Sequence, residues 1–93
     1  MIWGIIMEEL LKKLGITEKP VKNGKLYNID ISDSDEYGKI YSKLDRMDDL
    51  DEVSDSSQMT YESASIQFEN DDLLVTLLAD FEADIYKMTI KDL

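Results

Sequence analysis

The final part of the chain consists of three runs of residues that favour β-strands. The runs are TYESASIQFE, LLVTLLADF and DIYKMTIKDL, and each is rich in β-branched and aromatic residues. Short polar connections at residues 70–72 and 82–84 separate them. Strand-like runs joined in this way predict an antiparallel meander. Residues 73–78 are apolar on both faces of the predicted strand, which favours a central position in the sheet.

An amphipathic helix and a further strand are predicted near the N-terminus. Apolar residues recur at helical spacing at Trp3, Ile6, Met7, Leu10, Leu11 and Leu14. Gly15 followed by Ile16 is typical of a left-handed C-cap. Residues 25–31 alternate between apolar and polar, the pattern of a half-buried strand. The pair Asn23-Gly24 can close a hairpin with the short run around Val21, which Pro20 would restrict to a sheet edge.

A second helix is predicted over residues 34–50. Its apolar face is formed by Tyr37, Ile40, Tyr41, Leu44 and Met47. Asp33 is the expected N-cap, and Glu36 stands three residues later in the capping-box position. Serines at 54, 56 and 57 then mark a loop.

The predicted element order is therefore α-β-α-β-β-β in a single domain, residues 1–93. The fold class is α+β, with a four-stranded, mainly antiparallel sheet and two helices packed on one face. The other face of the sheet is left to solvent or to a partner. Met7 could begin a complete short amphipathic helix, in which case residues 1–6 form an N-terminal extension that either packs or stays free.

Composition argues against an enzyme and against a bound cofactor. The chain has no cysteine and no histidine, so it lacks thiol nucleophiles, disulfides and the side chain that most often binds transition metals. Glycine patterns that bind phosphates or dinucleotides are absent as well. The apolar start MIWGII meets charged residues too soon for a signal peptide or a membrane span. We expect a cytoplasmic protein without enzymatic activity.

Residues 33–44 partly match a calcium-binding EF-hand loop. Asp33 and Asp35 stand at the first and third ligand positions, and Gly38 at the turn position. Tyr37 and Leu44, however, occupy positions where calcium requires side-chain oxygens. Helix capping and the preference of acids for helix N-termini explain the same residues, so we expect no metal site.

The distribution of charge is the strongest functional signal. The net charge is −11, from 21 acids and 10 bases. Residues 1–29 carry five lysines and three glutamates, so the excess of acids lies beyond them. Between Arg46 and Lys87 there are twelve acids and no base. Soluble surfaces usually intersperse both signs, because concentrating one sign adds self-repulsion.

Two interpretations of this charge remain open. The acids can simply solubilise the protein from turns and helix ends, where aspartate is common. Alternatively, they form a surface that mimics the charge of nucleic acid and occupies a basic groove. The candidate partner-binding residues are, first, Asp48, Asp49, Asp51, Glu52 and Asp55, followed by Asp71, Asp72, Asp80, Glu82 and Asp84. Five apolar residues lie among the acids: Met47, Leu50, Val53, Tyr61 and Phe81. All but Val53 and Phe81 are expected in the core.

In size, acidity and α+β layout the chain resembles small phage-encoded DNA-mimic inhibitors, such as anti-CRISPR, anti-restriction and uracil-glycosylase inhibitor proteins. It is similar in the same respects to acidic immunity proteins that block nuclease toxins. The resemblance implies an inhibitor that blocks a basic nucleic-acid-binding protein of the nuclease or CRISPR-effector type, without binding nucleic acid or membrane itself. The inhibitor would act as a monomer or a homodimer.

The alternative function is a structural or assembly adaptor, possible for a protein of phage or mobile-element origin. It would bind through the open sheet face or through an edge strand near Leu93.

Overall fold

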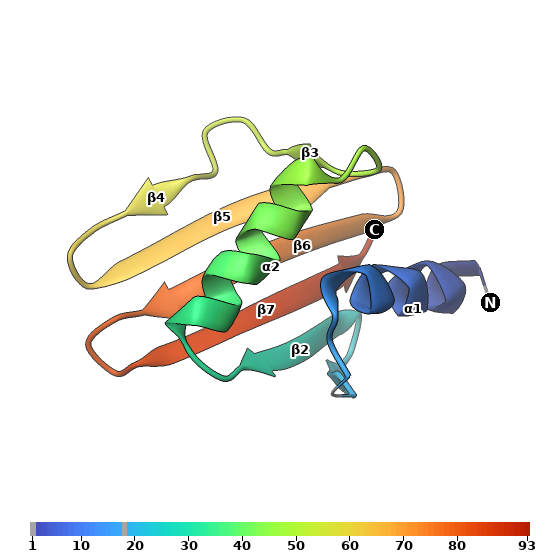
Figure 1. Ribbon diagram of the computed structural model, residues 1–93. Coiled ribbons are helices and arrows are strands. Elements are labelled where there is room, and N and C mark those ends of the chain that lie inside the picture. Colours follow the sequence, from blue (N-terminus) through green and yellow to red (C-terminus); the bar gives the residue numbers. More distant parts are fainter. Residues whose placement is uncertain (1, 18) are drawn as a thin grey trace.

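The computed structural model describes the backbone of residues 2–17 and 19–93 and the side chains of residues 7–17 and 19–93. The described elements, in chain order, are α1 (Ile2–Leu14), β1 (Val21–Asn23), β2 (Leu26–Ile31), α2 (Ser34–Arg46), β3 (Asp51–Glu52), β4 (Gln58–Met59), β5 (Ser63–Glu69), β6 (Leu73–Asp80) and β7 (Ile85–Asp92). The predicted α+β class is confirmed (Figure 1). The prediction of an extension over residues 1–6 concerns side chains that lie outside the described residues.

All strands belong to one antiparallel sheet, in the order β1-β2-β7-β6-β5-β3, with β4 also paired to β5. Over the described residues the sheet has seven strands, so the prediction of four was wrong. The four long strands, β2, β5, β6 and β7, are the predicted ones. The other three are short: β3 and β4 have two residues each, and β1 has three. Strands this short carry no alternation in the sequence and exist because they pair with a longer neighbour.

The prediction of an edge strand near Leu93 was also wrong. Leu93 follows β7, and β7 pairs with β2 on one side and with β6 on the other. The edges of the sheet are instead the short strands β1, β3 and β4. Short edge strands offer few free backbone groups and so limit pairing with other chains.

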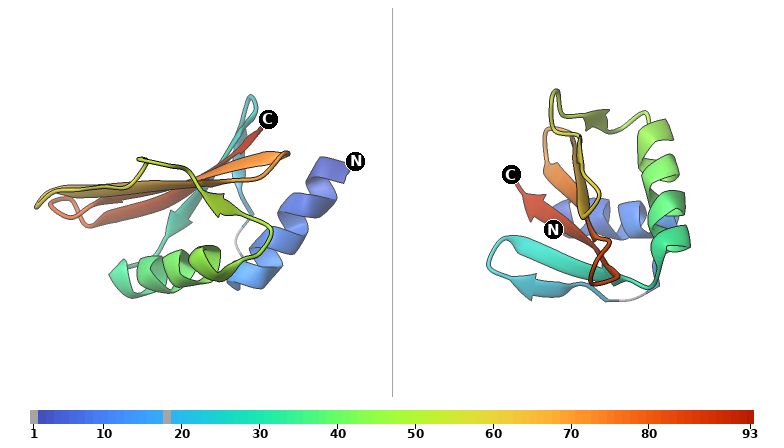
Figure 2. Two further views of the ribbon diagram at one scale, coloured as in Figure 1. Left: turned by 90° about the horizontal axis from the view of Figure 1, so that it is seen from above. Right: turned by 90° about the vertical axis from the view of Figure 1, so that its left-hand side faces the viewer.

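Both helices lie on one side of the sheet, but they do not form a parallel layer (Figure 2). α2 crosses the sheet and contacts β2 and β7. α1 packs at one end of the sheet, where it contacts α2. The expected coverage of one face by two helices is therefore provided mainly by α2.

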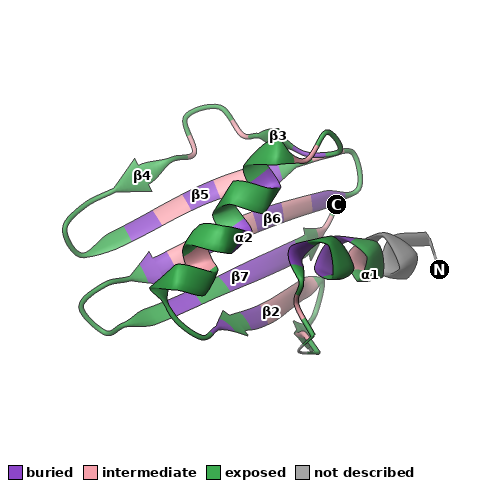
Figure 3. Ribbon diagram, viewed as in Figure 1, coloured by how far each residue is buried: buried purple, intermediate pink, exposed green. Residues whose placement is uncertain are grey.

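Strand alternation creates the core. In β6, residues 73, 75, 77 and 79 are buried, while 74, 76 and 78 are only half-buried (Figure 3). The partners of Val75 are Phe68 on β5 and Ile90 on β7, and both are buried as well. Because directly paired residues of antiparallel strands share a face, these side chains form one apolar face under the helices.

α1 ends at a glycine C-cap, as predicted. Gly15 has a φ of 74°, and its N–H donates to the Lys12 carbonyl. The Ile16 N–H donates to the Leu11 carbonyl at 2.9 Å, which completes a Schellman motif. Lys43 of α2 adds a third bond, from its Nζ to the Leu14 carbonyl at 3.2 Å. The end of α1 is thereby fastened to α2.

α2 begins as predicted but ends earlier. The Asp33 carboxylate accepts a hydrogen bond from the Glu36 N–H at 2.9 Å, so Asp33 is the N-cap. The helix was expected to reach Leu50, yet it ends at Arg46, and Met47 has an extended backbone. Leu50 is buried in the core, which requires the chain to leave the helical path. Asp48 and Asp49 would also be unfavourable at the negative end of a helix dipole.

Neither α1 nor α2 lies on the second face of the sheet (Figure 2). Its centre is a row of cross-strand neighbours, Asn28, Thr89, Thr76 and Gln67. The Gln67 amide donates to the Thr76 hydroxyl at 3.3 Å. Leu74 and Leu78 are half-buried on the same face. The centre of this open face is therefore neutral and polar, and Lys91 and Lys87 stand opposite the two leucines.

Candidate interaction surface

The ten predicted interface residues lie at two ends of the sheet and along one edge between them. The first group surrounds the start of β3 and the β5–β6 turn and comprises Asp48, Asp49, Asp51, Glu52, Asp71 and Asp72. We call it the Asp71 group. Three of the residues, Asp80, Glu82 and Asp84, lie at the β6–β7 turn. Asp55 lies in the loop between β3 and β4.

The two ends are separated by the length of β6. Eight residues of strand correspond to about 26 Å. The ten residues therefore do not form one compact patch. Antiparallel topology causes this separation, since consecutive turns of a meander must lie at opposite ends of the sheet (Figure 1).

Several of these acids also shape the backbone. Asp80 accepts a hydrogen bond from the Ala83 N–H at 3.1 Å and so closes the β6–β7 turn. Asp84 and Asp55 have φ values of 55° and 61°, in the left-handed region that aspartate tolerates better than most residues. Local turn chemistry thus explains why an aspartate stands at three of the ten positions.

All twelve acids between Arg46 and Lys87 are exposed. We call this set the acidic rim, because its members surround the β5–β6 hairpin on its two ends and its outer edge. Within residues 7–17 and 19–93, the only ion pair made by the rim joins Asp49 to Lys13 at 3.1 Å. Asp51 stands directly opposite Glu69 in the β3–β5 pair, which places two like charges side by side.

Basic residues gather on the opposite side of the sheet. Lys22 lies on β1, Lys25 in the β1–β2 turn, and Lys87 and Lys91 on β7. Lys22 also lies over the Tyr27 ring, at 5.7 Å from its centroid. Asp30 of β2 and Asp92 of β7 lie among these lysines, so the β1–β2–β7 side carries both signs, whereas the β5–β3 side is acidic.

Four exposed apolar side chains lie at the end of the sheet that carries the β4–β5 and β6–β7 turns, Met59 on the helix side and Ile85 on the open face. Tyr61 is 101% exposed, Met59 79%, Ile85 53% and Phe81 39%. The Phe81 N–H donates to the Glu62 carbonyl at 2.8 Å, so the two turns touch. We call these four residues, with Glu62, Asp80, Glu82 and Asp84, the tip.

The structure confirms some of the burial predictions made for the five apolar residues among the acids and corrects others. Tyr61 was expected in the core, which was wrong, because it stands in the turn that joins β4 to β5. Phe81 is exposed, as predicted, and Leu50 is buried, as predicted. Met47 packs half-buried against the core, and Val53 is half-buried rather than exposed. In the sequence, the polar residues Gln58 and Thr60 on either side of Met59 could have predicted a short strand followed by a turn.

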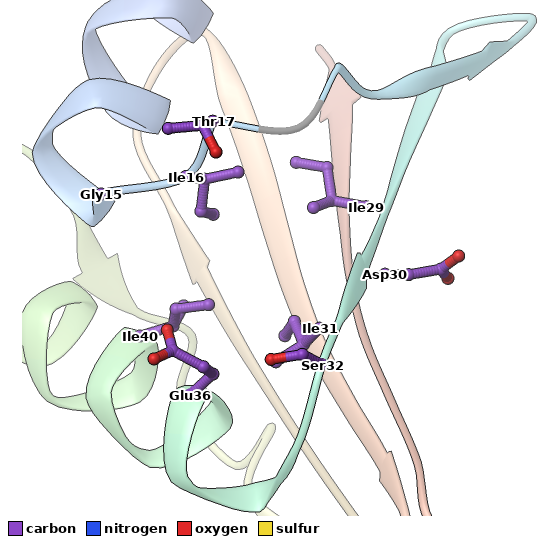
Figure 4. A pocket seen from close by; sticks show the side chains of 9 residues that line it. All are labelled: Gly15, Ile16, Thr17, Ile29, Asp30, Ile31, Ser32, Glu36 and Ile40. Atoms are coloured by element: carbon purple, nitrogen blue, oxygen red, sulfur yellow. The ribbon is translucent and has the colours of Figure 1, made fainter.

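One cavity lies beside the C-terminal end of α1. Its volume is about 180 Å³, and it lies between β2, α2 and the end of α1 and has isoleucines as its floor (Figure 4). Figure 4 shows that the Asp30 side chain points away from it. The Glu36 carboxylate at its rim accepts a hydrogen bond from Lys39 at 3.4 Å. Lining residues that could act as a nucleophile, Thr17 and Ser32, have no histidine or cysteine beside them.

Within the described part of the chain, acids nowhere gather closely enough in threes to hold a metal ion. Neither of its helices combines the length and apolarity that crossing a membrane requires. Comparison with protein-family models, curated proteins and solved structures finds no match for this chain.

Proposed function

We propose that this protein is a non-enzymatic inhibitor that binds a basic nucleic-acid-handling protein and blocks its nucleic-acid site. The observation that carries the proposal is the acidic rim: twelve exposed carboxylates, with one ion pair among them in the described residues. Unpaired exposed charge of one sign attracts a surface of the opposite sign over a long range and speeds association.

The size of the rim supports the nucleic-acid comparison. Its two ends are about 26 Å apart along β6. At about 3.4 Å per base pair, that length corresponds to roughly seven or eight base pairs. A basic groove that contacts six to ten phosphates has a comparable length. One molecule could therefore occupy such a groove from end to end.

The mechanism follows from charge alone. Nucleic-acid-binding grooves gather lysine and arginine, and a carboxylate surface in the groove satisfies those cations while it excludes the phosphate backbone. The rim itself repels nucleic acid. The inhibitor would therefore compete with nucleic acid for the partner and would not bind nucleic acid.

A capture experiment tests the proposal. The protein is immobilised and exposed to host lysate at about 50 mM and about 500 mM salt, and bound proteins are eluted with duplex DNA. We expect nucleic-acid-binding proteins to be retained at low salt, released by DNA, and lost at high salt, since screening weakens exposed charge pairs. The quadruple variant Asp48→Asn, Asp49→Asn, Asp51→Asn, Glu52→Gln should retain less. Retention that is insensitive to DNA and to salt would refute the proposal.

A second candidate function is an adaptor that binds through the open sheet face. Leu74 and Leu78 are half-buried there, and neither helix covers them. Binding through this face would depend less on salt than binding through the acidic rim, because the row at its centre is neutral and the charges opposite the two leucines are two lysines, Lys91 and Lys87. The same capture experiment separates the two functions. Substitution of Leu74 and Leu78 by serine would abolish adaptor binding and leave charge-dependent capture intact.

A further inference from the structure

We propose that the tip is the docking site for a basic polypeptide surface that carries apolar side chains among its lysines and arginines. This inference rests on the proposed function and names the partner chemistry of one part of the acidic rim. The rest of the rim would then contribute attraction at longer range, whereas the tip would supply the close apolar contact.

The tip combines the two kinds of contact that such a partner requires. Tyr61 and Met59 are among the most exposed apolar side chains described, at 101% and 79%. Apolar groups left this exposed gain the most when a partner removes them from water. Tyrosine is also enriched among the residues that contribute most to protein interfaces. The Asp71 group at the other end of the sheet borders one exposed apolar residue, Leu93, whose N–H donates to the Asp72 carbonyl at 3.0 Å, while Leu50 and Leu73 beside the group are buried.

Both turns of the tip are held in place by local hydrogen bonds. The Thr60 hydroxyl oxygen accepts from the Glu62 N–H at 3.2 Å and from the Ser63 N–H at 3.0 Å. The Thr60 N–H donates to the Ser63 carbonyl at 2.8 Å. Asp80 closes the neighbouring turn through the Ala83 N–H. Turns held in this way lose less conformational entropy on binding than free loops would.

A groove beside the tip can accept an apolar side chain of the partner. Its volume is about 190 Å³, and it lies between α2 and the β4–β5 hairpin. Tyr37, Tyr41, Met59 and Ile66 line it. Aromatic rings also attract lysine and arginine, so the lining suits an apolar side chain with a cation beside it. Met59 belongs both to the groove and to the tip, and its flexible side chain can adapt to the partner.

Charge decides which partner fits. The apolar residues of the tip are surrounded by Glu62, Asp80, Glu82 and Asp84, and all four are exposed. Two copies that met tip to tip would bring two such sets of carboxylates together, which is unfavourable. Nucleic acid and anionic lipid are repelled for the same reason. Lys87 is the nearest base along β7, two residues inside Ile85 on the open face. A cationic partner with apolar groups satisfies both the acids and the exposed apolar side chains.

Two fluorescent peptides of equal charge test the inference. One is an oligolysine, and the other alternates lysine with leucine. Titrations at about 50 mM salt should show that the wild-type protein binds the lysine–leucine peptide at least about tenfold more tightly, since buried apolar anchors contribute that much at interfaces. The double variant Met59→Ser/Tyr61→Ser should bind both peptides equally. Both residues are exposed, so the variant should fold like the wild type.

Matched controls separate apolar contact from charge. The variant Val21→Ser/Leu93→Ser removes two exposed apolar side chains away from the tip and should keep the preference for leucine. The variant Glu62→Gln/Glu82→Gln should weaken the binding of both peptides more than the variant Asp71→Asn/Asp72→Asn does, because only Glu62 and Glu82 belong to the tip.

The outcomes distinguish this inference from the proposed function. Absence of oligolysine binding at low salt would refute both. Binding of oligolysine without a preference for the lysine–leucine peptide would refute the docking site alone, as would a preference that survives Met59→Ser/Tyr61→Ser. Concentration-dependent self-association that this double variant abolishes would show that the tip is an interface between copies, which also overturns the inference.

Discussion

Individual side chains decide where the surplus negative charge destabilises this protein. Asp51 and Glu69 are direct cross-strand neighbours. Carbon atoms Cβ of such pairs lie about 5 Å apart, and like charges in this position oppose pairing of the strands. β3 has only two residues, so its attachment to β5 is sensitive to this repulsion.

Replacing Glu69 should therefore stabilise the protein. We expect Glu69→Lys to raise the free energy of unfolding by about 0.5–1 kcal/mol, because the repulsion between Asp51 and residue 69 becomes an attraction. Glu69→Gln should raise it by less, because it only removes the repulsion. Urea unfolding measures both. Glu52→Gln is the matched control, because it changes the net charge equally but stands opposite the apolar Phe68. Equal effects of Glu69→Gln and Glu52→Gln would show that net charge, and not this pair, is responsible.

Two tyrosines give the protein a defined sensitivity to alkali. Burial raises the pKa of Tyr86 above its ordinary value of 10.0, and the Asp84 carboxylate beside it acts in the same direction. Burial also raises the pKa of Tyr37, whose ring contacts Tyr86 at a centroid distance of 5.7 Å. The folded state thus keeps phenol protons that the unfolded chain loses above about pH 10.

The free energy of unfolding should consequently be unaffected by these groups below about pH 10 and should fall as pH rises beyond it. The double variant Tyr37→Phe/Tyr86→Phe should lose less stability between pH 9 and 11 than the wild type. Urea unfolding across that range provides the measurement. Tyr61→Phe, at a fully exposed position, is the control and should follow the wild type. An equal alkaline loss in the double variant would contradict the assignment.

At the scale of the elements, a hydrogen bond joins α1 to α2. Lys43 Nζ donates to the Leu14 carbonyl, which is one of the carbonyls left free at a helix C-terminus. Its positive charge also lies at the negative end of the α1 dipole. The other contacts of α1 are the exposed ion pair between Lys13 and Asp49 at 3.1 Å and the apolar packing of Leu10, Leu11 and Leu14.

Lys43→Met should lower the free energy of unfolding by about 0.5–1 kcal/mol, because it retains the apolar stem and removes only the bond and the charge. Amide hydrogen exchange should accelerate more in α1 than in α2. Lys39→Met is the matched control, since Lys39 makes only an exposed pair within α2. If exchange in α1 is unchanged, the bond does not fasten the helix.

At the scale of the whole molecule, the two acidic ends repel each other over a distance that salt controls. The molecule measures 40 Å in its longest dimension, and the ends of β6 are about 26 Å apart. The screening length is about 30 Å at 0.01 M salt and about 8 Å at 0.15 M. Charges at the two ends therefore interact at low salt and are screened from each other at physiological salt.

Thermal unfolding should accordingly shift to higher temperature as sodium chloride rises from about 0.01 M to about 0.2 M, because screening relieves self-repulsion of the folded state. Calorimetry measures the shift. A variant with the four substitutions Asp71→Asn, Asp72→Asn, Glu82→Gln and Asp84→Asn should respond less. A melting temperature that is constant or falls with salt would show that repulsion within the acidic rim does not destabilise the folded state.

Sequence alone determined the features that depend on local pattern. Runs rich in β-branched and aromatic residues identified β5, β6 and β7, and alternation identified β2. Helical spacing identified both helices, and Asp33 and Gly15 marked a helix start and a helix end. These elements follow from the sequence because periodicity and capping act within a few residues of each other. The exposure of the acids also followed, since charged groups without buried partners must remain in water.

Only the tertiary structure decided the remainder. β3 and β4 are strands because β5 lies beside them, and α2 ends at Arg46 because Leu50 fills the core. Tyr61 is exposed because a turn forms there, although tyrosine side chains are often partly buried in folded proteins. The acids lie at two ends because antiparallel strands send consecutive turns in opposite directions. The pairing of β3 and β4, the end of α2 and the placement of the acids depend on contacts between residues distant in the chain, which no local pattern encodes.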